Sequence, residues 1–284
     1  MTLDTLSLPL FLPADRMDRF AKACAAGADA VILDLEDAVA PETKDAARAG
    51  LTAMAGAPLP VLVRINAAGS AWFDRDLEAL AALPAAAVVL PKAETATSCA
   101  AVAERTGKPV VALIETARGL RDAEAVAASC ARLAFGSIDY AADLGMAHER
   151  DALLHARAAL VLAARLCGQP APLDGVTTAV RDTDLVAADA RHAVALGFGG
   201  KLLIHPAQIA PARQGFAPAP AEVDWARRVL DAGRGAGAVV NLDGMMIDAP
   251  VLKRAEQIIA RAREAGAGQE GRDRWQTDGS PSRS

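Results

Sequence analysis

The chain has 284 residues, enough for one large domain or two small ones. Apolar residues make up 52% of it, charged residues 23% and aromatic residues only 4%, a balance typical of a folded globular protein. The formal charge of −5 and a pI near 5.5 give no indication of nucleic acid or an anionic membrane as a partner. No apolar run reaches the roughly 18 residues of a membrane span and no signal peptide is evident, so we expect a cytoplasmic protein.

The chain shows one recurring unit, a short apolar or β-branched run followed by an alanine-rich amphipathic stretch. Eight runs are predicted to be strands, at residues 8–13, 30–37, 61–66, 87–92, 110–116, 133–139, 173–178 and 202–206. Seven helices are predicted between them, at about 15–26, 42–55, 73–82, 94–106, 119–129, 149–167 and 183–196. Apolar strands alternating with helices indicate a parallel sheet buried on both faces. Eight such units favour an α/β fold closed into a TIM (β/α)₈ barrel over an open sheet.

Glycine and proline support these boundaries. Gly27 and Gly107 follow the first and fourth helices, where a left-handed C-cap is expected, and Pro41 opens the second helix. The Gly199-Gly200 pair is interpreted as a break before the eighth strand. The seventh strand, with an aspartate and a glycine inside it, has the weakest pattern.

The pattern changes after Pro206. We predict that the barrel spans residues 1–212 and that a C-terminal helical extension spans 213–265, with helices near 221–232 and 250–264. The extension is expected to act as a flap or an oligomerisation arm. Residues 266–284 are polar and rich in glycine and serine, so we expect a disordered tail.

The four cysteines are widely separated and form no CxxC pair. They are Cys24, Cys99, Cys130 and Cys167. Their spacing supports neither a zinc site nor a redox motif. All four fall on predicted helices, where we expect buried or half-buried thiols in a reducing cytoplasm.

Charged or polar residues end most of the predicted strands, always on the C-terminal side. They are Glu36, Asp37, Arg64, Asn66, Lys92, Glu115, Thr116, Asp139 and His205. In a parallel barrel all these strand ends share one rim, and active sites in this fold lie on that rim. The pattern therefore predicts a polar site there.

Four of the rim residues are carboxylates: Glu36, Asp37, Glu115 and Asp139. Acids this close repel one another, and one would take up a proton unless a cation bound between them. Oxygen ligands without nearby cysteine or paired histidine select Mg²⁺, or Mn²⁺, over zinc. Glu115 and Asp139 end neighbouring strands, so we predict that they share one metal ion.

Several rim residues also have a structural interpretation. Asp34 lies on the same side of its strand as Glu36 and could be an internal ion-pair partner. Arg64 could be a structural partner of Glu36, and Asp37 could cap a turn. Lys92 could lie off the rim, at the surface.

The histidines have structural alternatives as well. His205 could pack at the top of the barrel. A surface position is expected for the other three histidines of the chain, which are His148, His155 and His192.

A family resemblance rests on six segments that occur in order. They are FLPADRMDRFAKACAAGADAVILDLEDAVAPETKDAAR, VLVRIN, LPKAET, ALIETARGL, AFGSIDYAADLG and GKLLIHPAQI. Together they resemble the citrate lyase beta-subunit family of the aldolase/citrate lyase barrel superfamily, over about residues 7–263. The motifs are specific for the family and much less specific for the substrate.

The resemblance implies a Mg²⁺-dependent carbon–carbon lyase acting on a 3-hydroxyacyl thioester of malyl-, citramalyl- or citryl-CoA type. Glu115 and Asp139 are the implied metal ligands, and Arg64 is the implied binder of the substrate carboxylate. The implied pocket also includes Glu36 and Asp37.

Further roles follow from the same resemblance. Gly136 and Ser137 are interpreted as small residues that let the substrate approach the backbone. The MMIDAP segment matches a family motif whose aspartate, here Asp248, enters a neighbouring subunit's site for the acid/base step. A homotrimer or hexamer is therefore implied, and a helix N-cap remains the alternative for Asp248.

Other functions stay open at this point. They are a malyl-CoA thioesterase or synthase, a metal-dependent 2-oxo acid aldolase, a class I aldolase using Lys92 as a Schiff-base amine, and a non-catalytic subunit. The chain could act alone on acyl-CoA or within a complex that supplies an acyl-carrier partner.

Overall fold

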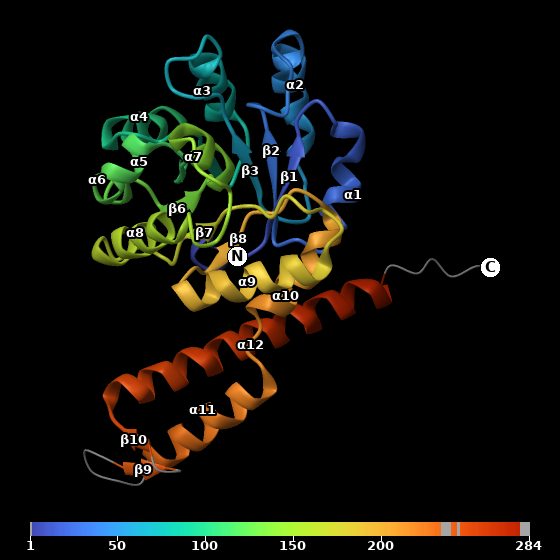
Figure 1. Ribbon diagram of the computed structural model, residues 1–284. Coiled ribbons are helices and arrows are strands. Elements are labelled where there is room, and N and C mark those ends of the chain that lie inside the picture. The colour runs from blue at the N-terminus through green and yellow to red at the C-terminus, as the bar shows by residue number, and fades with distance from the viewer. Residues whose placement is uncertain (1, 234–239, 243–244, 279–284) are drawn as a thin grey trace, which may run out of the picture. The chain divides into compact units, whose positions relative to one another are not determined.

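The computed structural model describes residues 2–233, 240–242 and 245–278. By its internal contacts the chain divides into two compact units, Met1–Ala212 and Arg213–Ser284. The first unit holds the eight-stranded sheet and the second holds a helical pair with a short two-stranded sheet (Figure 1).

Eight strands of the first unit form one sheet in sequence order, and every neighbouring pair is parallel. The strands are β1 (Pro9–Pro13), β2 (Ala30–Asp34), β3 (Val61–Arg64), β4 (Ala87–Leu90), β5 (Val110–Ile114), β6 (Arg132–Phe135), β7 (Leu173–Asp174) and β8 (Gly200–Lys201). Backbone hydrogen bonds bring the two edges together, from Phe11 to the Leu203 carbonyl at 2.8 Å and from Leu203 to the Pro9 carbonyl at 3.0 Å. The TIM-barrel prediction is confirmed.

Helices lie outside the ring of strands (Figure 1). The α-helices are α1 (Phe20–Cys24), α2 (Lys44–Gly50), α3 (Phe73–Ala82), α4 (Ala96–Thr106), α5 (Ala117–Arg121), α6 (Ala123–Ala127), α7 (Ser137–Leu144), α8 (Leu154–Leu166), α9 (Thr183–Leu196) and α10 (Ile209–Phe216). The 3₁₀ turns are η1 (Leu3–Thr5), η2 (Met17–Arg19), η3 (Pro41–Thr43), η4 (Leu51–Met54) and η5 (Pro206–Gln208). The helices predicted at 73–82 and 183–196 have the observed bounds. Gly107 follows α4 with a φ of 66°, the expected left-handed cap.

Most strands end earlier at the barrel rim than predicted. The strands predicted to end at residues 37, 66, 92, 116 and 178 end at Asp34, Arg64, Leu90, Ile114 and Asp174. Two further differences are larger. The predicted strand over 133–139 ends at Phe135, and helix α7 begins at Ser137 and runs to a left-handed cap at Gly145. The eighth strand is Gly200–Lys201, earlier than the predicted 202–206. A Cβ on Gly200 would lie 2.2 Å from the Ser7 carbonyl oxygen, so glycine there permits close strand contact and does not break the chain.

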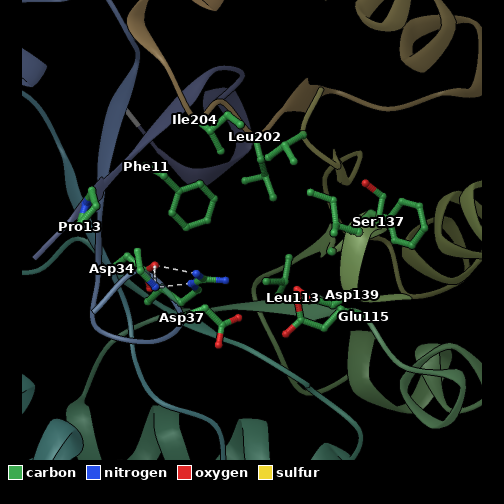
Figure 2. Close-up of a pocket in the computed structure, with 16 residues that line it drawn as sticks. Phe11, Pro13, Asp34, Asp37, Leu113, Glu115, Ser137, Asp139, Leu202 and Ile204 are labelled. Atoms are coloured by element: carbon green, nitrogen blue, oxygen red, sulfur yellow. Dashed lines mark hydrogen bonds and ion pairs between the residues drawn. The ribbon is translucent and has the colours of Figure 1, made fainter. Parts of the chain in front are cut away.

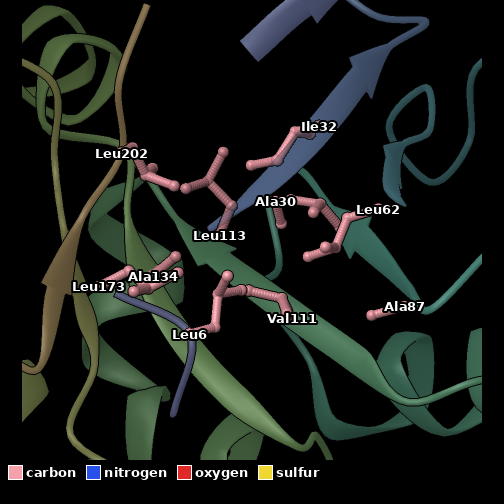
Figure 3. Close-up of a cluster of buried hydrophobic side chains, with 11 residues drawn as sticks. Leu6, Ala30, Ile32, Leu62, Ala87, Val111, Leu113, Ala134, Leu173 and Leu202 are labelled. Atoms are coloured by element: carbon pink, nitrogen blue, oxygen red, sulfur yellow. The ribbon is translucent and has the colours of Figure 1, made fainter. Parts of the chain in front are cut away.

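The barrel interior is filled by side chains that recur at every second residue of the strands (Figure 3). The buried cluster consists of Leu6, Ala30, Ile32, Leu62, Ala87, Val89, Val111, Leu113, Ala134, Leu173 and Leu202. Successive strand residues point to opposite faces, so the next inward residue after each row lies at the rim. Ile32 is thus followed by Asp34, Leu62 by Arg64, and Leu113 by Glu115.

The second unit contains α11 (Pro220–Gly233), the antiparallel strands β9 (Val240–Leu242) and β10 (Met245–Ile247), and α12 (Ala249–Asp278). Its own small core is formed by Ala226, Val229, Ile247, Ala255 and Ile258. Helix α12 continues to Asp278, and the disordered tail expected over 266–284 stays a prediction. Glutamate, glutamine and arginine between the glycines favour a helix. Residues 279–284 lie outside the described part.

Two further predictions concern the cysteines and membrane-spanning helices. The four cysteines are free thiols, buried at Cys24 and Cys99 and half-buried at Cys130 and Cys167, as expected. Across the part of the chain that is described, every helix is too short or too polar to cross a bilayer.

Candidate functional site

A cavity of ≈ 340 Å³ opens at the C-terminal ends of the strands. Its lining includes three kinds of residue: the carboxylates Asp34, Asp37, Glu115 and Asp139, the cation Arg64, and apolar side chains such as Phe11, Leu113, Leu202 and Ile204. Figure 2 shows Phe11, Leu202 and Ile204 facing Asp34, Asp37 and Glu115 across the cavity. An apolar wall with a few convergent polar groups is typical of a small-molecule site.

Arg64 is fixed by Asp34, its direct partner in the β2–β3 register. Its Nε donates to Asp34 Oδ1 at 2.7 Å and its Nη2 to Asp34 Oδ2 at 2.6 Å, a bidentate pair. Asp34 is 2% exposed and also accepts from the backbone N–H of Glu36 at 2.9 Å. The guanidinium is therefore held in one orientation, and its third nitrogen, Nη1, is not used by Asp34. The ion-pair alternative for Asp34 is confirmed.

Glu36 lies between two cations. Its Oε1 accepts a short hydrogen bond from Lys92 Nζ, and its Oε2 lies 3.2 Å from Arg64 Nη1 without a hydrogen bond. Burial raises the pKa of Glu36 more than the charges of Arg64 and Lys92 lower it. Lys44 holds the loop that carries Glu36, because its Nζ donates to the Leu35 and Glu36 carbonyls at 2.7 Å each.

Glu115 is the most deeply buried acid of the cavity wall, at 1% exposed. Its Oε1 accepts from the backbone N–H of Lys92 at 2.8 Å, while its Oε2 has no hydrogen-bond partner among the described residues. Lys92 has a φ of 47°, a left-handed conformation that is uncommon outside glycine. Burial, and then the charges of Glu36 and Asp139, raise the pKa of Glu115 to about 8.

Gly136 makes room for the Glu115 carboxylate. The β5–β6 register pairs Ile114 with Phe135, which brings the following residues, Glu115 and Gly136, together. A Cβ on Gly136 would lie 2.2 Å from Glu115 Oε2 and 2.4 Å from Glu115 Cβ. Gly136 and Ser137 both line the cavity, as the sequence interpretation requires. The absence of a side chain at Gly136 therefore also leaves space for the Glu115 carboxylate, a role that the sequence did not indicate.

Asp139 reaches the cavity from the first turn of α7 and not from a strand end. It is half-buried and adds its charge to the field at Glu115. Across the described residues, no group of three or more His, Cys, Asp or Glu side chains is arranged around a metal position. Two carboxylates, one with an unpartnered oxygen, match the protein share of a Mg²⁺ site, since Mg²⁺ keeps several positions for water and substrate. Asp37 lies at the exposed mouth.

Four residues predicted for the rim have other positions or partners. Asn66 binds Asp76, with its Nδ2 donating at 2.7 Å. Thr116 caps α5 by accepting from Gly119 N at 3.0 Å. His205 is exposed and caps η5, accepting from Ala207 N at 3.1 Å, so it does not pack at the barrel top.

Lys92 is the fourth. Its side chain is 41% exposed, forms an ion pair with Glu36 and does not line the cavity. Burial alone would lower the pKa of Lys92, but the hydrogen bond and charge of Glu36 outweigh it and raise the pKa.

Two features of the site were not predicted. Phe11 of β1 lies under the guanidinium of Arg64, 5.0 Å from ring centroid to Cζ, a cation–π contact. Ser137 Oγ lies 2.9 Å from Nε2 of His148, a histidine expected only at the surface. The period-two pattern of PLFLP could have indicated Phe11. The pairing of Ser137 with His148 depends on the loop after α7 and has no local sequence signal.

Asp248 belongs to the second unit. Its Oδ1 accepts from Val251 N at 3.1 Å, and its carbonyl accepts from Leu252 N at 3.0 Å. It therefore caps the start of α12, the structural alternative weighed for it. Its catalytic role stays a prediction.

Comparison with known proteins agrees with the motifs. The family model described as HpcH/HpaI aldolase/citrate lyase matches residues 8–206. A citrate lyase subunit beta-like protein of Mycobacterium tuberculosis is 44% identical, covering 90% of this chain and 95% of that protein. A (3S)-malyl-CoA thioesterase of Cereibacter sphaeroides is 35% identical, covering 91% of this chain and 95% of that protein. The crystal structure of CitE from M. tuberculosis in complex with magnesium, acetoacetate and coenzyme A is 41% identical, with a TM-score of 0.82, covering 91% of this chain and 98% of that one. The family resemblance predicted from the motifs is confirmed.

Proposed function

The chain belongs to the HpcH/HpaI aldolase/citrate lyase family, and we propose that it is a magnesium-dependent carbon–carbon lyase. Its substrate would be a 3-hydroxyacyl thioester of malyl-, citramalyl- or citryl-CoA type, cleaved into an acyl thioester and a 2-oxo acid. The observation that carries the proposal is Glu115, a buried carboxylate with an unpartnered oxygen, beside Asp139 and across the cavity from the apolar wall.

Glu115 and Asp139 would hold the magnesium ion. A buried carboxylate whose pKa is raised by burial and by the charges of Glu36 and Asp139 is a poor arrangement without a cation and a good one with it. When bound, the ion would supply Lewis-acid polarisation of the substrate's oxygens. The magnesium in the similar CitE structure supports this assignment.

Arg64 would bind the substrate's free carboxylate. Asp34 accepts from Nε and from one N–H of Nη2, so the N–H groups of Nη1 and the second N–H of Nη2 are left for a ligand, and the ion pair prevents the guanidinium from turning away. A planar guanidinium held in this way can orient a carboxylate far better than a flexible lysine can. Glu36 lies 3.2 Å from Nη1 and would limit the position that the carboxylate can take.

The apolar wall would shield the reacting carbons. Phe11, Leu202 and Ile204 close the side opposite the acids (Figure 2), where they would exclude water from the thioester enolate that forms when the carbon–carbon bond breaks. The enolate carbon then needs a proton. Asp248 of a neighbouring chain, in a homotrimer or hexamer, is our candidate donor.

A Schiff-base mechanism is disfavoured by Lys92. A Schiff-base lysine must be neutral, which requires a lowered pKa. The pKa of Lys92 is raised because Glu36 outweighs the effect of burial, so the amine stays protonated. An aldolase of that type would keep its activity in EDTA and would be trapped by borohydride with substrate.

Hydrolysis of the same thioester is the second candidate. The 35% identity to a (3S)-malyl-CoA thioesterase over most of both chains favours it. A hydrolase and a lyase release different products, since only hydrolysis yields free CoA and only cleavage yields a 2-oxo acid. Product analysis therefore separates them.

The test is a panel of malyl-, citramalyl-, methylmalyl- and citryl-CoA with MgCl₂, read by 2-oxo acid and by free CoA. We expect 2-oxo acid release from at least one thioester, abolished by EDTA and by Glu115→Ala or Asp139→Ala. Glu104→Ala, at an exposed site on α4, is the matched control and should leave activity unchanged. Full activity in Glu115→Ala or Asp139→Ala would refute the metal assignment, and free CoA alone would favour the hydrolase.

A further inference from the structure

A serine–histidine pair borders the cavity. Ser137 is 1% exposed, lies at the start of α7 and lines the cavity. Its Oγ lies 2.9 Å from Nε2 of His148, which is in the loop that follows α7. His148 itself is exposed to solvent. The pair therefore connects the cavity wall with bulk water through two side chains.

The serine hydroxyl is held in place by its surroundings. A Cβ on Gly175, just after β7, would lie 2.2 Å from Ser137 Oγ and 2.6 Å from Ser137 Cβ. The backbone at Gly175 thus packs directly against the serine side chain and leaves it little freedom. Figure 2 shows Ser137 on the side of the cavity that carries Glu115 and Asp139.

Burial, and then the nearby cations, favour the neutral form of His148. Burial lowers its pKa below 6.5, and the cations Arg157 and Lys201 lower it further, against the opposing effect of Asp189 and Asp174. Both carboxylates have other partners. Asp174 accepts from Arg157 Nε at 2.8 Å, and Asp189 is bound by the side chains of Arg150 and Thr177. A neutral imidazole near pH 7 can accept a proton from the serine.

We propose that Ser137 and His148 form a proton relay that removes the proton from the substrate's hydroxyl group during carbon–carbon cleavage. This inference rests on the proposed lyase function and adds the base that the reaction needs. Ser137 would touch the substrate, and His148 would act through Ser137.

The substrate hydroxyl gives its proton to Ser137 Oγ, while the serine's own proton passes to His148 Nε2, which becomes an imidazolium. The oxygen's electron pair forms the C=O of the 2-oxo acid, and the carbon–carbon bond pair becomes the thioester enolate. The enolate carbon takes a proton from a separate acid. His148 returns its proton to water.

Another base could stand in the same cavity. Asp34 is bound to Arg64, and Glu115 and Asp139 are assigned to the metal, which leaves Asp37 as the rival among the acids of the lining. Asp37 is exposed at the mouth, where water competes for it. A buried hydroxyl backed by an imidazole is the better-matched base near neutral pH.

The experiment compares four variants, His148→Gln, Ser137→Ala, His155→Gln and Asp37→Asn, with the wild type on the thioester that gives 2-oxo acid. His148→Gln keeps a group that can accept from the serine but cannot take its proton, and Ser137→Ala removes the relay. We expect kcat to fall about 100-fold in both with KM changed less than about threefold, as for loss of a general base. His155→Gln, an exposed histidine on α8, is the matched control and should behave as wild type.

The pH profile separates a relay from a structural role. In the wild type, kcat should fall at low pH as His148 becomes protonated and can no longer accept. His148→Gln should lose this acid limb. Unchanged kcat in both variants, with loss of activity in Asp37→Asn, would overturn the relay. Loss of free CoA release with 2-oxo acid release unchanged would overturn it too, because the pair would then serve hydrolysis.

A second readout does not depend on turnover. With ¹⁵N-labelled histidine, the His148 Nε2 resonance is assigned by its absence in His148→Gln. Glyoxylate with MgCl₂ should shift this resonance in the wild type and leave it unmoved in Ser137→Ala. A wild-type resonance that does not move on addition of glyoxylate counts against the relay. Absence of 2-oxo acid release by the wild type would instead refute the lyase function. The His148 resonance would still show whether His148 responds through Ser137 to a ligand in the cavity.

Discussion

Glu115→Gln tests the idea that the cavity contains a carboxylate that is unfavourable without a cation. The side chain is 1% exposed, and burial together with Glu36 and Asp139 raises its pKa to about 8 from an ordinary 4.5. The folded chain therefore keeps a proton that the unfolded chain releases above pH 4.5. Stability must fall as pH rises from about 4.5 to about 8, because the unfolded state binds fewer protons in this range.

The size of the effect follows from the pKa difference. Each pKa unit corresponds to ~1.4 kcal/mol, so the acid costs the metal-free fold about 3 kcal/mol at pH 7. Glutamine has nearly the same shape and no charge, and its Oε1 can still accept from Lys92 N. We expect metal-free Glu115→Gln to be more stable than the wild type by up to that amount at pH 7. The difference should shrink towards pH 5 and grow towards pH 8.

Urea unfolding in EDTA at pH 5, 7 and 8, followed by circular dichroism, measures this difference. MgCl₂ should then stabilise the wild type and have little effect on Glu115→Gln, because a ligand stabilises only the fold that binds it. Glu104→Gln, at an exposed site, is the control and should follow the wild type at every pH. A stability difference that does not change with pH, or equal stabilisation of both proteins by MgCl₂, would refute the reasoning.

Three further changes test the supporting structure. Gly136→Ala places a methyl group 2.2 Å from Glu115 Oε2, so we expect a loss of about 1–3 kcal/mol in thermal unfolding and weaker magnesium binding by calorimetry. Asp34→Asn removes the buried partner of Arg64 and should cost about 3 kcal/mol in urea unfolding, with a raised KM for the thioester. Asp248→Asn keeps a good helix cap and should retain its melting temperature while losing turnover, whereas Asp248→Ala should lose about 1 kcal/mol as well. Full turnover in Asp248→Asn would show that Asp248 acts only as a helix cap.

The barrel could be predicted because its signals are local and repeated. Each strand is a short apolar run, and period-two alternation places Arg64 and Glu115 on the inside of their strands. The failures occurred where a residue's meaning depends on a distant contact. Gly200 was interpreted as a break, but its lack of a side chain lets β8 approach Ser7. Asp139 was placed on a strand because nothing in the local sequence separates the end of β6 from the first turn of α7.

The partners of the site residues were harder to predict than the residues themselves. The pairing of Arg64 with Asp34, and not chiefly with Glu36, depends on strand register, which one sequence does not specify. The contact of Ser137 with His148 depends on the path of the loop after α7. Sequence spacing carries no information on such contacts between separate elements.

The residues proposed for chemistry and those that would select the substrate come from different parts of the fold. Asp34, Arg64 and Glu115 continue the inward rows of the barrel core, so the packing that stabilises the fold also fixes their positions. Ile138 and Ile204 reach the same cavity from outside those rows, on α7 and on the segment after β8. A change at such positions would alter the shape of the cavity, and so which of the proposed substrates fits, without moving the acids. Such a separation would let one framework serve relatives with different names, a citrate lyase subunit beta-like protein and a (3S)-malyl-CoA thioesterase.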